Sequence, residues 1–182
     1  MATTMNTRAL STSTKRTIHE EEAARGFSSV GSLAVRVAGW VPTRVDLRFA
    51  GTPQQQLGLS LGTVLVYMAT HLTAHQIAEK WAAAAPAARV LSQSLPRDRR
   101  PALSSGPWLV SAMVRFAGAP TVTTDVMTSQ PGRDVPTLLR VQVGPVTWEL
   151  ADAVAYTSML NAWRVAADLL EARADAASVR AS

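Results

Sequence analysis

Val35-Arg36-Val37-Ala38-Gly39 has a near copy 79 residues later, Val114-Arg115-Phe116-Ala117-Gly118. Further along, residues 59–64 (LSLGTV) are echoed by residues 141–146 (VQVGPV), now 82 residues apart. Chance similarity is the alternative interpretation, because the chain is rich in alanine and valine. The shared order of the segments at nearly constant spacing favours an internal duplication, in which each half forms one structural unit.

Apolar and polar residues alternate through much of the first half, which is typical of strands with one buried face. The pattern predicts strands over residues 33–38, 44–49, 57–61 and 63–68. A helix follows, with Thr73 as its expected N-cap and Gln76 three residues later, as in a capping box. Pro86 is expected to kink or shorten this helix, because proline cannot continue the hydrogen-bond ladder.

The second half repeats this order of elements. Its predicted strands cover residues 109–116, 121–127, 139–143 and 146–150. Asp152 is the expected N-cap of a long helix that ends near Ala174. Trp81 and Trp163 occupy matched positions on the apolar faces of the two helices, and Trp148 alternates with apolar neighbours. All three indoles are therefore predicted to be buried.

These patterns predict an α+β fold of two pseudo-symmetric β-β-β-β-α units, with antiparallel sheets packed on two helices. Both units are expected to form one domain, because 182 residues with a hydrophobic content of 47% suit a single core. The expected boundaries are a flexible N-terminal arm over 1–28, the first unit over 29–92, a basic linker over 93–107, the second unit over 108–174 and a tail over 175–182.

The charge of the chain favours an anionic partner. The formal net charge is +5, and all cations except Lys15 and Lys80 are arginines. A basic balance suits nucleic acid or another polyanion, while charge that serves only solubility is the alternative interpretation. The chain has no cysteine, which excludes disulfides, thiolate zinc sites and a cysteine nucleophile.

Sequence motifs for catalysis are missing. The chain has no Walker A loop, no GxGxxG dinucleotide motif and no GxSxG nucleophile elbow. His71, His75 and Glu79 have the spacing of ligands on one helix face, but His71 precedes the expected N-cap. We therefore expect a protein that is not an enzyme and that holds no metal and no cofactor.

Strand parity predicts an open sheet face that carries arginines. Guanidinium groups make bidentate contacts with phosphate, and an aromatic ring beside them can stack on a base. The alternative is a solvated face whose arginines are balanced by Asp46, Asp125 and Glu149. The expected nucleic-acid interface comprises Arg36, Trp40, Arg44, Arg48, Tyr67, Arg115 and Arg140, together with Arg97, Arg99 and Arg100 of the linker.

This layout resembles that of the Whirly and PUR-repeat proteins. The resemblance lies in the tandem four-strand-plus-helix units and not in any sequence motif. In those families such units bind single-stranded nucleic acid on their sheet surfaces. The resemblance implies that the chain binds single-stranded DNA or RNA.

Three alternative functions compete with this hypothesis. The chain could be a structural or assembly protein that uses exposed strand edges to bind protein partners or copies of itself. Residues 72–81 are similar to the first helix of a helix-turn-helix regulator, with 87–95 as the recognition helix. A small-molecule pocket beside Trp148 and His71 is the third.

The sequence predicts a cytoplasmic protein without a membrane span, because no apolar run is long enough to cross a bilayer. Residues 1–18 are rich in threonine and serine and contain no acidic residue. They have the composition of either a basic arm or an organelle transit peptide, so an organelle matrix is the alternative location.

Overall fold

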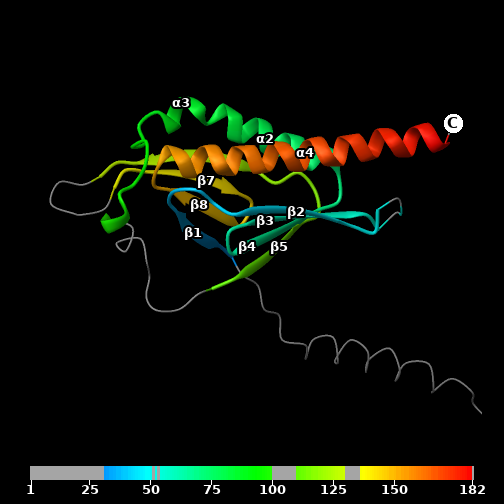
Figure 1. Ribbon diagram of the computed structural model, residues 1–182, viewed down its shortest axis with the longest axis horizontal. Helices are drawn as coiled ribbons and strands as arrows, with labels where there is room; N and C mark the ends of the chain where they lie inside the picture. The colour runs from blue at the N-terminus through cyan, green and yellow to red at the C-terminus, as the bar shows by residue number, and fades with distance from the viewer. Residues whose placement is uncertain (1–30, 51, 53, 100–109, 130–135, 182) are drawn as a thin grey trace, which may run out of the picture. The chain divides into compact units, whose positions relative to one another are not determined.

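The computed structural model describes the backbone of residues 31–181, except 51, 53, 100–109 and 130–135. The arm expected over 1–28 and the second part of the expected linker lie outside these residues. Residues 32–182 form one compact unit, and its fold is α+β, with two four-stranded mixed sheets and a small number of helices (Figure 1).

Sheet 1 is built mainly from the first half of the chain. Its strand order is β2 (Thr43–Arg48), β3 (Gln56–Leu61), β4 (Val64–Met68) and β5 (Ala112–Phe116). β3 pairs antiparallel with both β2 and β4, whereas β5 pairs parallel with β4. Sheet 1 therefore takes its last strand from the second half.

Sheet 2 is built mainly from the second half of the chain and takes its first strand from the first half. Its order is β1 (Leu33–Val37), β8 (Val146–Leu150), β7 (Leu138–Val143) and β6 (Val122–Met127), and β1 lies parallel to β8. The prediction of wholly antiparallel sheets was wrong. Each half places its first strand in the other half's sheet, and a helix lies in sequence between β4 and β5, as a parallel connection requires.

Two glycines make the tight turns that close the sheets' central hairpins. Gly62 (φ 61°) joins β3 to β4, and Gly144 (φ 55°) joins β7 to β8. Each turn has two central residues, and the second, Thr63 or Pro145, has no positive φ. A positive φ at the first position alone is the pattern of a type II′ turn, for which glycine is the favoured residue.

The first helix begins earlier than expected. α2 covers His71–Ala83, and its N-cap is Thr70, whose side chain accepts a hydrogen bond from the Thr73 amide. The assignment of Thr73 as N-cap was wrong, because Thr70 is the residue with extended backbone that precedes the helical turn.

α2 ends at Ala83, shortened as Pro86 predicted, and Pro86 lies in the first turn of the short helix α3 (Ala85–Ala88). Residues 89–95 are not helical. The recognition helix on which the helix-turn-helix alternative depends, over 87–95, therefore does not form.

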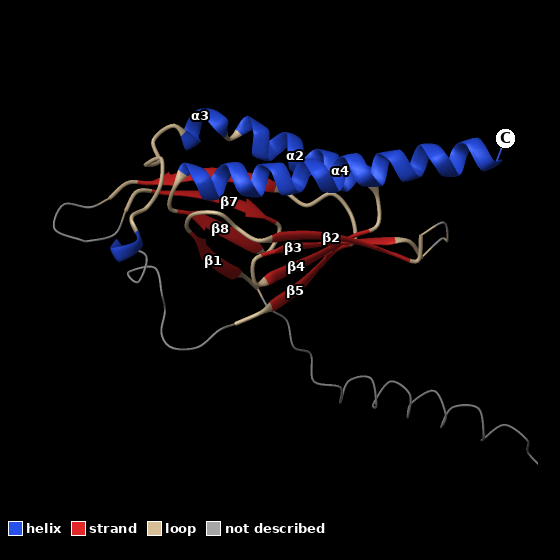
Figure 2. Cartoon of the chain, in the orientation of Figure 1, coloured by secondary structure: helices blue, strands red, loops and turns tan. Residues whose placement is uncertain are grey.

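The last helix, α4, covers Ala153–Ala181 and so continues past the expected end near Ala174. α2 and α4 pack against each other along the two sheets, as Figure 2 shows. No helix in the part of the chain that the structure describes is both long and apolar enough to cross a membrane.

The core lies between the helices and the inner faces of the sheets. Trp81, Trp148 and Trp163 are fully buried, which confirms the sequence prediction for all three. Trp148 contacts each of the other two edge-on, with ring centroids 6.0 Å apart. The place expected for a small-molecule pocket beside Trp148 is therefore occupied by indole packing.

Candidate nucleic-acid interface

The five arginines predicted for one open face lie on two different sheets. Arg44 and Arg48 on β2 and Arg115 on β5 belong to sheet 1, whereas Arg36 on β1 and Arg140 on β7 belong to sheet 2. The prediction of a single arginine face was wrong because β1 and β5 are exchanged between the halves, and strand parity cannot reveal a strand's neighbours.

The open face of sheet 1 is an ordered grid of side chains. One row crosses the sheet through Arg44, Ser60, Leu65 and Met113, which are paired in register from β2 to β5. Arg44 is exposed, and Met113 is 70% exposed. This row therefore places a cation at one edge and apolar side chains at the other.

The next row crosses the same face through Asp46, Gly58, Tyr67 and Arg115. Tyr67 is buried, and a Cβ built on Gly58 would lie 3.2 Å from the Tyr67 ring. Tyr67 thus lies across the space that the glycine leaves open. Arg115 stands exposed at the end of the row.

Tyr67 supports an arginine and does not offer an open stacking surface. The Arg48 guanidinium carbon lies 5.7 Å from the centroid of the Tyr67 ring, a cation–π contact. Because Tyr67 is buried, its ring does not offer the open surface for direct stacking on a base that the sequence predicted. Arg48 is itself half exposed, and a guanidinium plane can take the stacking role.

Cations dominate the open face of sheet 1. Arg44, Arg48 and Tyr67 line a shallow hollow of about 240 Å³, together with Asp46, Gly58, Ser60 and Leu65. Asp46 is the one acidic residue on this face among the described strands, and it lies 3.7 Å from Arg48. Both partners are about half exposed, so this ion pair is weak and leaves Arg48 accessible.

Sheet 2 neutralises its arginines. The Glu149 side chain is 5% exposed; its Oε2 accepts from Arg36 Nε at 2.6 Å, and its Oε1 accepts from Arg140 Nη2 at 2.8 Å. Asp125 faces Arg140 in the neighbouring strand. The hollow of about 330 Å³ on this face is lined by both acids and by Arg140. The charges on this face of sheet 2 are therefore balanced, as the alternative interpretation expected, although Glu149 itself is buried.

Burial alone would raise the pKa of Glu149, but the hydrogen bonds and charges of Arg36 and Arg140 outweigh it and hold the pKa below its ordinary value. A carboxyl with a lowered pKa stabilises the fold above its unfolded-state pKa, and this contribution is lost as the pH falls through the lowered value.

We therefore expect Glu149→Gln to lower the free energy of unfolding by about 2 kcal/mol at neutral pH, because glutamine carries no charge and its NH2 group cannot accept a hydrogen bond from an arginine. The deficit should be smaller at an acidic pH below the lowered pKa of Glu149 than at neutral pH, because the wild-type carboxyl is then protonated and uncharged. Urea unfolding at both pH values measures it. A deficit that is the same at both values would contradict the ion-pair origin.

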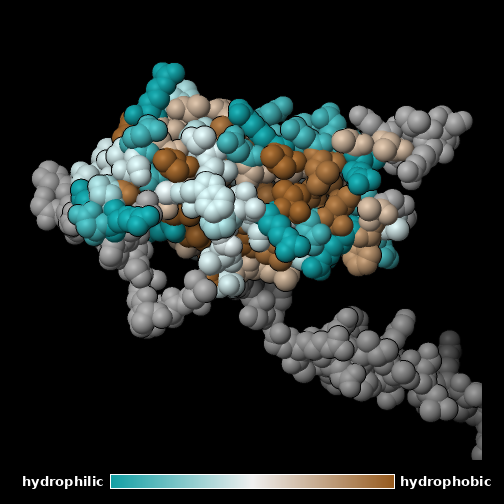
Figure 3. All heavy atoms as spheres, in the orientation of Figure 1, coloured by the Kyte–Doolittle hydropathy of each residue, from teal (hydrophilic) through white to brown (hydrophobic). Residues whose placement is uncertain are grey.

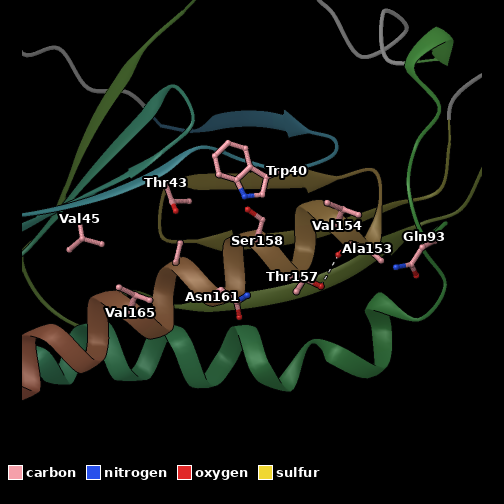
Figure 4. Close-up of a pocket in the computed structure, with 11 residues that line it drawn as sticks. Trp40, Thr43, Val45, Gln93, Ala153, Val154, Thr157, Ser158, Asn161 and Val165 are labelled. Atoms are coloured by element: carbon pink, nitrogen blue, oxygen red, sulfur yellow. Dashed lines mark hydrogen bonds between the residues drawn. The ribbon is translucent and has the colours of Figure 1, made fainter.

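Trp40 lies apart from the arginines of sheet 1. It is 72% exposed and lines an open groove of about 600 Å³ with Thr43, Val45 and residues of α4. Figure 3 shows hydrophobic residues gathered on the surface where Figure 1 places α4 and β2. Figure 4 shows Trp40 beside Ser158 at this groove. Val45 is on the inner face of β2, so Trp40 and the Arg44 side chain serve different surfaces.

The described basic residues of the expected linker, Arg97 and Arg99, are not part of the sheet grid. Arg97 and Arg99 are exposed in a short turn over residues 97–99. Arg100 lies outside the described residues.

The two histidines, His71 and His75, lie at the start of α2. His71 is the first residue of α2, so the expectation that it precedes the helix was wrong. Its ring centroid lies 6.5 Å from that of His75, whose Nε2 is 3.1 Å from Glu171 Oε2. Within the described ranges, no three histidine or acidic side chains are grouped as metal ligands would be.

Leu65 and Met113 also belong to the open face, although the sequence pattern was not interpreted that way. Apolar residues in strands are usually assigned to the core, and the available signal was parity, since Leu65 alternates with the buried Val64 and Val66. Comparison with protein-family models, curated proteins and solved structures found no match to this chain.

Proposed function

We propose that this protein binds single-stranded nucleic acid on the open face of sheet 1, without a catalytic step. The observation that carries the proposal is the placement of Arg44, Arg48 and Arg115 on one face with Asp46 as the single described acid. The proposal includes a pseudo-symmetric relation between the two halves, like the layout of the Whirly and PUR-repeat proteins, and the presence of two four-stranded sheets is compatible with it.

The grid of side chains suits a single nucleic-acid strand that runs across the sheet. Arg44 and Arg48 lie on one edge strand and Arg115 on the other, three interstrand spacings away, or about 14 Å. A sugar-phosphate backbone could contact both edges. Leu65 and Met113 would then lie beneath the bases, which a duplex would keep stacked and hidden. Single strands are therefore the favoured ligand.

Affinity should come from charge and should be weakly dependent on sequence. Three phosphate contacts on a single strand correspond to a slope of about −2 in a plot of log affinity against log salt concentration. Sheet 2 should contribute little, because Glu149 and Asp125 offset Arg36 and Arg140.

The double variant Arg44→Glu/Arg48→Glu is expected to abolish binding of oligothymidine and oligouridine in a low-salt shift assay. The matched control is Arg89→Glu/Arg164→Glu, which changes the net charge equally at exposed residues away from sheet 1. The control should lose much less affinity for the oligonucleotide, by about the amount that the change in net charge causes on its own. Normal binding by the first variant, or equal loss in both, would contradict the proposal.

A further inference from the structure

β2 lies at the edge of sheet 1, and no other described strand pairs with its outer backbone groups. The Gly62 amide donates to the Pro42 carbonyl at 2.9 Å, and the register continues with Thr43 opposite Leu61. Hydrogen-bonded pairs alternate along an antiparallel ladder. Arg44, Asp46 and Arg48 therefore bond to β3 through their backbone, and Thr43, Val45 and Leu47 direct their N–H and C=O groups away from the sheet.

The side chains of this edge complement a second copy of themselves. When two β2 strands pair antiparallel about a twofold axis at Val45, Arg44 faces Asp46 of the second copy, and Asp46 faces Arg44. These are non-hydrogen-bonded pairs, in which side chains lie closest. A shift of two residues in one direction sets Arg44 against Arg48 and Asp46 against Asp46. The opposite shift sets Arg44 against Arg44. Charge thus selects one register.

We propose that two copies of this chain associate edge to edge through β2 in this register. The pairing satisfies the outward backbone groups of Thr43, Val45 and Leu47 with about six hydrogen bonds between the copies. It joins the two copies of sheet 1 into one continuous sheet of eight strands. This association does not depend on nucleic-acid binding, although it would extend the arginine face across both copies.

The apolar surface beside β2 supports the same partner. Val45 and Leu47 on its inner face are only half buried, and Val165 on α4 is 54% exposed. The groove that Trp40 lines adjoins this strip (Figure 4). In the proposed register Val45 meets Val45 of the second copy, so the exposed strips of both copies come together at the twofold axis.

The other three edges of the described sheets lack this self-complementarity. On their open faces, β1 carries Ala34 and Arg36, and Arg36 is already bound to Glu149. β5 carries Met113 and Arg115. β6 carries Asp125 between Thr123 and Met127. None of them alternates opposite charges, so β2 is the edge best suited to a second copy.

Sedimentation of the full chain without nucleic acid tests the association. The wild type should form a dimer. Arg44→Asp and Asp46→Arg alone each set like charges against one another and should shift the population to monomer. The double exchange Arg44→Asp/Asp46→Arg keeps the net charge and restores both attractive pairs, so it should dimerise again. A wild type that stays monomeric at its solubility limit, or single variants as dimeric as the wild type, would overturn the proposal.

Cysteine cross-linking tests the register, since the chain has no cysteine of its own. An equimolar, refolded mixture of Arg44→Cys and Asp46→Cys chains should give the mixed disulfide dimer on mild oxidation. Opposed residues in non-hydrogen-bonded pairs lie about 4.5 Å apart between Cα atoms, within disulfide range. Each variant alone should cross-link poorly. Efficient self-cross-linking of Asp46→Cys or Arg44→Cys would indicate one of the shifted registers and contradict the proposed one.

Discussion

Replacing Asp152 with alanine is expected to lower the free energy of unfolding by about 4 kcal/mol. Asp152 is fully buried, and its carboxylate accepts hydrogen bonds from the amides of Gly39, Leu95 and Ala155, at 2.8–3.0 Å. These amides belong to the segment after β1, the segment after α3 and the first turn of α4. Alanine leaves all three donors buried without their acceptor, and each costs about 1–3 kcal/mol.

The matched control is Thr70→Ala. Thr70 caps α2 as Asp152 caps α4, 82 residues earlier in the chain, but it is exposed and its hydroxyl accepts from one amide, that of Thr73. Its loss should cost about 1 kcal/mol, the usual value of an N-cap. Urea denaturation of both variants measures the difference. Equal costs would show that Asp152 acts only as a helix cap and not as a link between three segments.

Most local features of the fold were predictable from the sequence, because they depend on neighbouring residues, although the N-cap of α2 is Thr70 and not Thr73. Alternation placed the second strand over 44–49, and the structure has it at Thr43–Arg48. Pro86 marked the end of α2 and Asp152 marked the start of α4, since proline and acceptor side chains act on the backbone beside them.

Non-local features could not be predicted in the same way. Period-two patterning tells which side chains share a face of one strand but not which strand lies alongside. The exchange of β1 and β5 between the sheets therefore remained hidden, as did the bonds that join Asp152 to Gly39 and Leu95.

The placement of the candidate site's residues on one face was also predicted correctly only where the residues come from consecutive strands. Arg44, Arg48 and Tyr67 lie within one run of strands from the first half, and they do line one hollow. Arg36 and Arg140 were assigned to the same face, but their pairing with Glu149 depends on β1 lying beside β8. A carboxylate on a neighbouring strand offsets the charge of an arginine. Sheet 2 is therefore less basic than its arginines alone predicted.

The second large effect is expected at Trp148, at the centre of the core. Its indole is fully buried against Trp81 and Trp163, with ring centroids 6.0 Å away in both cases. Trp148→Ala should lower the free energy of unfolding by about 4 kcal/mol, because it removes these contacts and leaves a cavity that the surrounding rings cannot fill.

Trp148→Phe should cost much less, about 1 kcal/mol or below. Phenylalanine keeps most of the aromatic packing, and it removes an indole N–H that has no acceptor among the described residues. Losing a buried donor of this kind offsets part of the lost volume. Urea denaturation followed by far-UV circular dichroism measures both variants, and Trp40→Ala, at a 72% exposed site, is the neutral reference. A phenylalanine variant as unstable as the alanine variant would contradict this account, because it would mean that the indole N–H itself stabilises the core.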